Sequence, residues 1–398
     1  MNILYHHRTR STDAQRIHIL EIVKAFEQLG HKVEIVSLVP TDAEQNNARR
    51  DAGEAGWKKF VRRIPFGYEA VQLAYNLVGI PLLLARMIGS KVDFLYERYS
   101  LFNFTGVVCA RLCRVPLILE VNSPFALEQS RDRDIRSPRF AQWTERLICN
   151  LATRVIVVST PLARIMESSG VPAAKIEVMP NGVSPDHFQP AGSSDLRASL
   201  GIGAADAVIG FVGWFRKWHG LEMLLEAFHR SGVARRGVKV LLIGDGPAMA
   251  DLSAYVREQK LERDVLFSGP LPHAEVPRYL ATIDIAVQPA ANEYCCPMKI
   301  LEYMALAKPI VAPRQENIEE LLDEEAAEFF TPGDAASLAA ALASLSGDRA
   351  RAQAMGRHAR QLLFSRGYLW TANAERVVEM VREHGAERRA APYLAAGR

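Results

Sequence analysis

Short apolar runs alternate with amphipathic segments along the chain. The first run, residues 2–7, is followed by Thr12 and Gln15 at a capping-box spacing and then by apolar residues at helical intervals. Gly30 ends this predicted helix, and residues 33–38 form the next apolar run. Strands and helices that alternate in this order are typical of α/β domains with parallel sheets.

The alternation continues to the end of the chain with one interruption. Further strands are expected at residues 94–96, 117–121, 155–159, 207–213, 238–244, 265–268, 283–287 and 309–312. Residues 189–194 are uncharged and rich in turn formers, so they predict a linker. The sequence therefore predicts two successive Rossmann-like domains, residues 1–188 and 189–366, with a cleft at the carboxyl ends of their strands. Residues 367–398 form a last amphipathic helix and a tail.

The composition narrows the class of protein. Of the 398 residues, 49% are hydrophobic and 23% are charged, which excludes disordered, collagen-like and coiled-coil chains. The net charge of +3 argues against a whole-surface nucleic-acid binder. The five cysteines are an odd number without zinc-site spacing, so a reducing compartment is favoured. The longest uncharged stretch, residues 70–85, is shorter than the ~20 residues of a spanning helix, so no transmembrane segment is predicted.

Residues 288–305 hold the most informative segment. A predicted strand ends near Gln288, a turn-rich loop follows, and Pro297 stands where a first helical residue is expected. The start of such a helix presents unpaired N–H groups, which can bind an anion. Glu302 lies about one turn further on, where it can accept hydrogen bonds from sugar hydroxyls. The alternative is a glutamate that only caps or solvates the helix.

A second segment, residues 211–220, places cations at the end of a strand. The loop between strand and helix contains Arg216, Lys217 and His219. Cations aimed at a departing nucleoside diphosphate would stabilise its negative charge in the transition state. The alternative is an exposed basic loop without a ligand.

Together these residues resemble the GT-B-fold glycosyltransferases of family 4, over nearly the whole chain. The resemblance is carried, in order, by Asn2-Ile-Leu, Gly30-His-Lys-Val, Ser159, Asn181-Gly-Val, Gly213, Gly244-Asp-Gly246-Pro and Pro297-Met-Lys-Ile-Leu-Glu302-Tyr-Met. It implies an α/β fold of two Rossmann-like domains whose parallel sheets face each other across a cleft, with the C-terminal helix crossing back to the first domain. It also implies retaining transfer of a sugar from a nucleotide donor, and it is greatest to the branch that builds bacterial polysaccharides and surface glycans.

The resemblance assigns roles to the donor side. Glu302 matches the second Glu of the Glu-x7-Glu motif, which binds the donor ribose. Arg216 and Lys217 would hold the diphosphate in catalysis, and His219 stands where many members have a second cation. The other expected donor contacts are Gly213, Gly244, Gly246, Glu293, Tyr294, Pro297, Met298, Lys299 and Ile300, with Glu293 placed among the catalytic residues and backbone amides of Met298 and Lys299 facing the phosphate. A dinucleotide GxGxxG site fails, because Met249 occupies the third glycine position.

The chain departs from the family pattern in three places. Tyr294 stands where the first Glu of the motif belongs, and Asn122 stands where many members have a histidine near the reacting carbon. In place of a Gly-Gly loop after the first strand, the acceptor side is expected to use Asp13, Gln15 and Arg16. Family members need no metal or other cofactor, and no Asp-x-Asp signature appears in a suitable loop.

Three local arrangements can also be predicted from strand patterns. Glu97 and Arg98 end one predicted strand and are expected to form a structural ion pair. Strand alternation is expected to turn Glu120 away from Asn122. Of His6 and His7, which end the first strand, one is expected to have its hydrogen bonds satisfied internally.

Residues 57–66 mix large apolar residues with Lys58, Lys59, Arg62 and Arg63 and contain no acid. This is typical of an interfacial segment, to which anionic lipid contributes about 1 kcal/mol per basic side chain. The alternative is a solvated segment over the acceptor site.

We therefore expect a cytoplasmic enzyme, peripheral on the inner face of the membrane. Its expected partners are a nucleotide-sugar donor and a lipid-linked or glycan acceptor, without nucleic acid. Two other functions stay open. One is a non-catalytic nucleotide-binding scaffold, favoured by Tyr294 and Asn122, and the other is a nucleotide-sugar hydrolase or epimerase.

Overall fold

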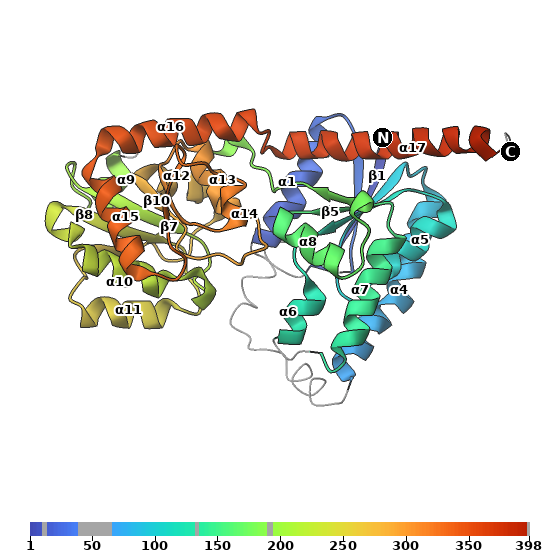
Figure 1. The fold of residues 1–398 in the computed structure, drawn as a ribbon, viewed down its shortest axis with the longest axis horizontal. Helices are drawn as coiled ribbons and strands as arrows, with labels where there is room; N and C mark the ends of the chain where they lie inside the picture. The colour runs from blue at the N-terminus through green and yellow to red at the C-terminus, as the bar shows by residue number, and fades with distance from the viewer. Residues whose placement is uncertain (10–13, 39–65, 132–134, 189–193, 396–398) are drawn as a thin grey trace. The chain divides into compact units, whose positions relative to one another are not determined.

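The computed structural model describes residues 1–9, 14–38, 66–131, 135–188 and 194–395. The chain divides into two compact units, Met1–Pro180 with Trp370–Arg398 (unit 1) and Asn181–Leu369 (unit 2). Each unit is built on a six-stranded parallel sheet flanked by helices (Figure 1). Most of the predicted linker lies outside the described residues, and the division between the units falls before it.

Unit 1 has the strand order β2-β1-β3-β4-β5-β6. Its strands are β1 (Asn2–His6), β2 (Lys32–Val36), β3 (Phe94–Arg98), β4 (Leu117–Val121), β5 (Arg154–Val157) and β6 (Ile176–Val178). Its helices are α1 (Ala14–Gln28), α4 (Gly67–Gly89), α5 (Thr105–Cys113), α6 (Phe125–Arg131), α7 (Pro138–Leu151), α8 (Thr160–Ser168) and α17 (Trp370–Ala395), with a short 3-10 helix η1 (Ala173–Lys175). The chain changes direction across the sheet between β1 and β3, which is where open α/β sheets form their ligand crevice.

Unit 2 has the strand order β12-β11-β10-β7-β8-β9. Its strands are β7 (Ala207–Val212), β8 (Val238–Ile243), β9 (Val265–Phe267), β10 (Ile285–Val287), β11 (Ile310–Pro313) and β12 (Ala327–Phe330). Its helices are α9 (Ser194–Ser199), α10 (Leu221–Ser231), α11 (Met249–Glu258), α12 (Val276–Thr282), α13 (Met298–Ala305), α14 (Glu316–Glu319), α15 (Ala335–Gly347) and α16 (Arg349–Ser365), with 3-10 helices η2 (Pro185–His187), η3 (Lys217–His219), η4 (Val233–Arg236) and η5 (His273–Glu275). Its switch point lies between β7 and β10.

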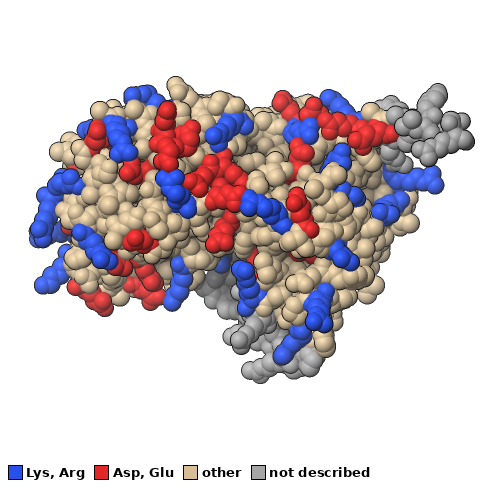
Figure 2. All heavy atoms as spheres, viewed as in Figure 1, with Lys and Arg blue, Asp and Glu red and all other residues tan. Residues whose placement is uncertain are grey.

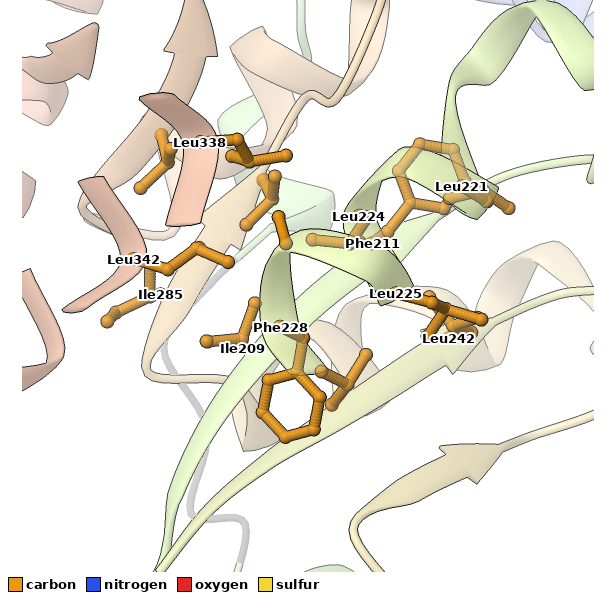
Figure 3. Close-up of a cluster of buried hydrophobic side chains, with 14 of the residues drawn as sticks. Ile209, Phe211, Leu221, Leu224, Leu225, Phe228, Leu242, Ile285, Leu338 and Leu342 are labelled. Carbon is orange, nitrogen blue, oxygen red and sulfur yellow. The ribbon is translucent and has the colours of Figure 1, made fainter. Parts of the chain in front are cut away.

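The core of unit 2 forms between the sheet and helices α10 and α15 (Figure 3). Leucines and Phe228 recur at helical spacing along one face of α10, so this face is buried continuously. The residues in contact are Ile209, Phe211, Leu221, Leu224, Leu225, Phe228, Leu242, Ile285, Leu338 and Leu342. Truncating Phe228 to alanine would cost about 3–5 kcal/mol of folding free energy. This packing fixes β7 and β10, the two strands that carry the loops described below.

Helix α17 packs within unit 1. Its first residue, Trp370, meets the ring of His18 edge-on, with centroids 4.6 Å apart. The Asn373 side chain donates to the carbonyl oxygen of Pro180 at 2.8 Å, and Arg376 pairs with Glu177 at 2.8 Å. The C-terminal helix is therefore a structural part of the first Rossmann-like unit.

Among the described residues, one helix has the length and composition to cross a membrane, namely α4 with 23 residues. Helix α4 is longer than the uncharged stretch of residues 70–85, because it extends past the charged residues Glu69 and Arg86. One side of α4 is tied to unit 1, since Asn76 donates to the carbonyl oxygen of Phe102 at 2.8 Å and accepts from the Phe104 N–H at 2.7 Å. A helix that packs against a domain meets the same criteria of length and composition.

Candidate active site

The unit 2 site is formed by the two loops that follow β7 and β10. These strands are hydrogen-bonded neighbours and run parallel, so their carboxyl ends meet at one edge of the sheet. The first loop, residues 213–220, contains Arg216 and Lys217. The second, residues 288–297, leads into α13. The structure therefore brings together the two segments that the sequence analysis considered separately.

Lys299 lies on the first turn of α13 and reaches the first loop with its side chain. Its Nζ lies 4.5 Å from the ring centroid of Phe211. A Cβ atom built on Gly213, which has φ +147°, would lie 3.5 Å from the same Nζ. Burial lowers the pKa of Lys299 to about 8, although Cys295 and Glu302 favour its charged form. Only the backbone amide of Lys299 was expected to contact the phosphate, so the structure adds a cation to the site.

His219, by contrast, does not supply a cation. Burial, together with the nearby charges of Lys299 and Arg216, lowers its pKa to about 3. The His219 ring lies against Trp218 (3.8 Å between centroids) and Phe211 (5.4 Å), and a backbone hydrogen bond links it to Trp214. His219 is therefore a neutral ring enclosed by its own loop, and its expected contact with the donor stays a prediction.

Glu302 lies one turn after Lys299, on the same side of α13. Burial raises the pKa of Glu302 to about 7, and the charge of Lys299 opposes this rise. No other described residue hydrogen-bonds its carboxylate. A half-buried carboxyl with unused acceptor atoms can bind hydroxyl groups of a ligand.

Arg216 and Lys217 are exposed, at the start of η3. Lys217 lies 3.8 Å from Asp251, with both side chains in solvent, and such pairs contribute little stability. Lys217 can therefore exchange this partner for a phosphate at small cost.

The start of α13 offers further donors. The backbone N–H groups of Met298 and Lys299 have no partner among the described residues, and Pro297 precedes them at the N-cap. Ile300 behaves differently, since its side chain is buried in the core and its N–H donates to the carbonyl oxygen of Pro297 at 3.0 Å. Ile300 therefore presents no group to a ligand, and its assignment as a donor contact needs correction.

Gly244 and Gly246 close the loop after β8 against the first loop. A Cβ atom on Gly244 would collide with the carbonyl oxygen of Gly213, and one on Gly246 with the backbone of Phe215. The Phe215 N–H donates to the Asp245 carbonyl oxygen at 2.7 Å across this contact. Packing between the loops by itself requires glycine at both positions, and the approach of this backbone to a nucleotide stays a prediction.

Two buried asparagines hold the second loop. Asn317 donates its side-chain amide to the carbonyl oxygens of Asn292 (3.0 Å) and Cys295 (2.7 Å). Asn181 donates to the carbonyl oxygen of Cys296 at 2.9 Å. The role of Asn317 was missed, because its partners lie more than twenty residues away along the chain.

The same loop contains Glu293 and Tyr294, at the end of the Glu-x7-Glu motif where this chain departs from the family pattern. Glu293 is exposed, and Tyr294 is half-buried with its hydroxyl 3.5 Å from the side-chain amide of Asn292. Glu293 is therefore accessible from solvent, one residue before Tyr294, which stands where the family pattern has its first glutamate.

In unit 1, Asn122 follows β4 and donates its side-chain amide to the carboxylate of Glu120. The prediction that Glu120 points away was wrong, because residues two apart on a strand share a face. Glu120 also accepts from Tyr96 (2.8 Å) and Arg98 (2.8 Å). Although burial favours the neutral acid, these partners and His18 hold the pKa of Glu120 below its usual value.

The predicted pair between Glu97 and Arg98 is absent from these contacts, because adjacent strand residues face opposite sides of the sheet. Glu97 instead lies 2.6 Å from His6 and accepts from Asn103 at 2.8 Å. His6 thus has its internal partners. Burial lowers the pKa of His7 to about 4, and its Nε2 is buried without a hydrogen bond.

Only two of the three residues predicted for the acceptor side lie in the described part of the chain. Gln15 is exposed and Arg16 is half-buried on the first turn of α1, close along the chain to the end of β1. Asp13 lies outside the described residues, as do Lys58, Lys59, Arg62 and Arg63. The described residues contain no group of three or more His, Cys, Asp or Glu side chains suited to a metal ion.

Each of the two units matches a known protein family. Residues 15–187 match the family described as Glycosyltransferase Family 4, and residues 206–348 match Glycosyl transferases group 1. The D-inositol 3-phosphate glycosyltransferase of Kineococcus radiotolerans is 26% identical over 96% of this chain and 94% of its own. The 2-deoxystreptamine glucosyltransferase of Streptomyces kanamyceticus is 31% identical over 47% of this chain and 50% of its own.

Among solved structures, HepE of Anabaena in complex with UDP and glucose superposes with a TM-score of 0.68 at 18% identity, over 96% of this chain and 99% of that one. The fold and the paired family matches thus define a GT-B glycosyltransferase. The chain belongs to glycosyltransferase family 4.

Proposed function

We propose that this enzyme transfers a hexose-type sugar, with retention of configuration, from a nucleoside-diphosphate donor to a lipid-linked or glycan acceptor in bacterial surface-glycan synthesis. The observation that carries the donor assignment is the convergence of Lys299 with the loop of Arg216 and Lys217. Both Lys299 and Arg216 act electrostatically on His219, so the two cations lie near one point of the site.

The chemistry follows from these charges. A departing diphosphate gains negative charge as the bond to the sugar breaks, and three cations together with two amides of α13 would stabilise it. The leaving phosphate oxygen can then take the proton of the acceptor hydroxyl on the same face of the sugar. This route depends on positioning and charge rather than on a protein acid–base pair, and we propose that it needs no metal.

The other donor contacts have matching chemistry. Glu302 would accept hydrogen bonds from the ribose hydroxyls, and Glu293 would contact the sugar from the second loop. In unit 1, Asn122, oriented by Glu120, would act near the reacting carbon. Gln15 and Arg16 would serve the acceptor side. The complex of HepE with UDP makes uridine the first base to test.

There is one alternative for the acceptor and there are two for the activity. The inositol-phosphate and aminocyclitol enzymes among the relatives favour a small soluble acceptor as the alternative. Tyr294 and Asn122 favour a non-catalytic nucleotide-binding scaffold. A nucleotide-sugar hydrolase or epimerase is the other alternative. Product analysis with and without acceptor separates these activities, since only a transferase forms a glycoside with the added acceptor.

The donor assignment is tested by thermal unfolding with UDP, GDP, ADP and their sugars. A ligand at ~100 times its dissociation constant stabilises by about 2.7 kcal/mol, which is about 5–10 °C in Tm for a unit of this size. One nucleotide series is expected to produce this rise and to lose it in Lys299→Met. Absence of any shift would contradict the donor site.

For location, we propose a cytoplasmic enzyme peripheral on the inner face of the membrane, held in part by the basic residues Lys58, Lys59, Arg62 and Arg63. The support is the composition of residues 57–66, which combines four cations with large apolar side chains and no acid.

A further inference from the structure

Helix α4 exposes an apolar stripe along its whole length. The stripe follows a spacing of three and four residues, which keeps it on one face of the helix. Its members, all exposed, are Val71, Ala74, Leu77, Val78, Pro81, Ala85 and Ile88. Leu77 is 79% exposed and Ile88 is 74% exposed. Because the opposite face packs into unit 1, the outer face of α4 would ordinarily be polar, and it is not.

Helix α7 continues this surface. Its exposed aromatic residues Phe140 and Trp143 are stacked, with ring centroids 5.9 Å apart, and Phe140 also stacks on Phe102 at 5.6 Å. The carbonyl oxygen of Phe102 accepts the hydrogen bond from Asn76 of α4, so the two helices share a neighbour. We use the name α4–α7 face for the exposed residues of α4 and α7 together with Arg136, which lies just before α7.

The two helices also meet at their N-terminal ends. The carboxylate of Glu69 in α4 accepts the backbone N–H of Arg136 at 2.6 Å. In Figure 1 both helices extend along the same part of unit 1. The aromatic residues of α7 and the aliphatic stripe of α4 are therefore parts of one surface region.

The charge on this face has a single sign. Its exposed charged residues are Arg86, Arg136, Arg139 and Arg146. Of these, Arg86 is paired at 3.2 Å with Glu34, a half-exposed residue of β2. The acids of the two helices, Glu69 and Glu145, are both buried, and burial raises the pKa of Glu145 to about 7. Figure 2 shows blue and tan atoms over the lower end of this unit. Aliphatic, aromatic and arginine side chains without exposed acids match an anionic lipid surface, which accepts apolar groups and attracts cations.

We propose that the α4–α7 face docks on anionic lipid, with α4 lying in the plane of the membrane surface. The buried Asn76 and Glu69 hold the other side of α4 against unit 1, so the helix stays part of the domain. A second copy of the chain suits this face less well, because a two-fold contact would bring arginines of both copies together. The inference deepens the proposed function by assigning the surface that meets a lipid-linked acceptor.

The test is co-sedimentation of the full-length protein with phosphatidylcholine vesicles that contain 30% phosphatidylglycerol, at low salt and without nucleotide. Wild type is expected to sediment with these vesicles and not with pure phosphatidylcholine. Leu77→Glu combined with Ile88→Glu is expected to abolish sedimentation. Arg139→Gln and Arg146→Gln are each expected to lower the partition coefficient about fivefold.

Matched controls come from unit 2. Phe364→Glu changes an exposed apolar residue and Arg349→Gln an exposed arginine, and both are expected to sediment like wild type. All these positions are exposed, so Tm and nucleotide binding are expected to be unchanged. Wild type that remains in the supernatant, or a Leu77/Ile88 variant that sediments like wild type, would overturn the proposal.

Two further measurements distinguish lipid docking from a contact between two copies of the chain and from the proposed transferase activity. If sedimentation velocity shows a dimer that Leu77→Glu converts to monomer, the face is an interface between copies and the lipid proposal is wrong. Vesicle binding is measured without donor or acceptor, so vesicle binding without sugar transfer would contradict the proposed function alone. Transfer to a soluble glycan without vesicle binding would contradict the docking alone.

Discussion

The amino group of Lys299 lies 4.5 Å from the ring centroid of Phe211. Phe211 is on β7 and Lys299 is on α13, so this contact joins β7 to the helix that follows its neighbouring strand β10. It places a cation beside Gly213, where the backbone turns toward Arg216 and Lys217. Lys299 therefore supplies a positive charge that His219 does not, because the lowered pKa of His219 leaves its ring neutral near pH 7.

The first prediction concerns the pH dependence of nucleotide binding. Because the pKa of Lys299 is lowered to about 8, the free enzyme loses this cation as the pH rises through 8. Nucleoside-diphosphate affinity is expected to fall about tenfold between pH 7 and pH 9, measured by calorimetry. In Lys299→Arg the charge persists and the decline is expected to disappear. A wild-type affinity that stays constant over this range would contradict the role of Lys299.

The second prediction separates ribose binding from phosphate binding. Glu302→Gln removes an acceptor for the ribose hydroxyls and is expected to weaken UDP binding about tenfold or more, as expected for a charge-assisted hydrogen bond. The affinity for inorganic pyrophosphate, which has no ribose, is expected to change little. Equal losses for both ligands would instead place Glu302 with the phosphates.

The third prediction concerns the second loop. Asn317→Ala removes two hydrogen bonds to the carbonyl oxygens of this loop and is expected to raise the KM for the donor about tenfold, with a smaller change in kcat. Gln315→Ala is the control, because Gln315 makes a single long bond of 3.4 Å to Ala291. A similar effect of both substitutions would assign Asn317 only a general structural role.

The fourth prediction concerns the stability of unit 1. Glu120→Gln leaves Arg98 buried without its carboxylate and is expected to lower the free energy of unfolding by about 3–5 kcal/mol. Since folding lowers the pKa of Glu120, its contribution is present at neutral pH and lost as the pH falls below about 4.5. Urea unfolding from pH 7 to pH 3 is expected to show a weaker acid dependence in the variant. An unchanged stability at pH 7 would contradict this pairing.

Most of the fold could be predicted from the sequence, because buried parallel strands form continuous apolar runs. Two strands were missed, β6 and β12. Both lie at the edge of their sheet, are short, and contain a glutamate, so their apolar signal is weak. Strands buried on both faces were all detected, whereas of the four edge strands β2 and β9 were detected and β6 and β12 were not.

The site could be predicted where its residues lie within one segment. The loop of Arg216 and Lys217 and the helix of Glu302 each appear as a motif followed by a helix start. The side-chain contacts of Lys299 and Asn317 could not be predicted, because they depend on which strands become neighbours. The contact between Glu120 and Asn122 could have been predicted, since it requires only the two-residue period of a strand.

The central claim is that Lys299, and not His219, completes the cation set for the diphosphate. The most direct test is calorimetric titration at pH 7 of the nucleoside diphosphate that gives the largest thermal shift. Lys299→Met is expected to weaken binding about 10- to 100-fold, whereas Arg230→Met, an exposed control on α10, is expected to bind like wild type. His219→Gln, which keeps a neutral side chain, is expected to lose less than fivefold. Wild-type affinity in Lys299→Met, together with a large loss in His219→Gln, would contradict the account.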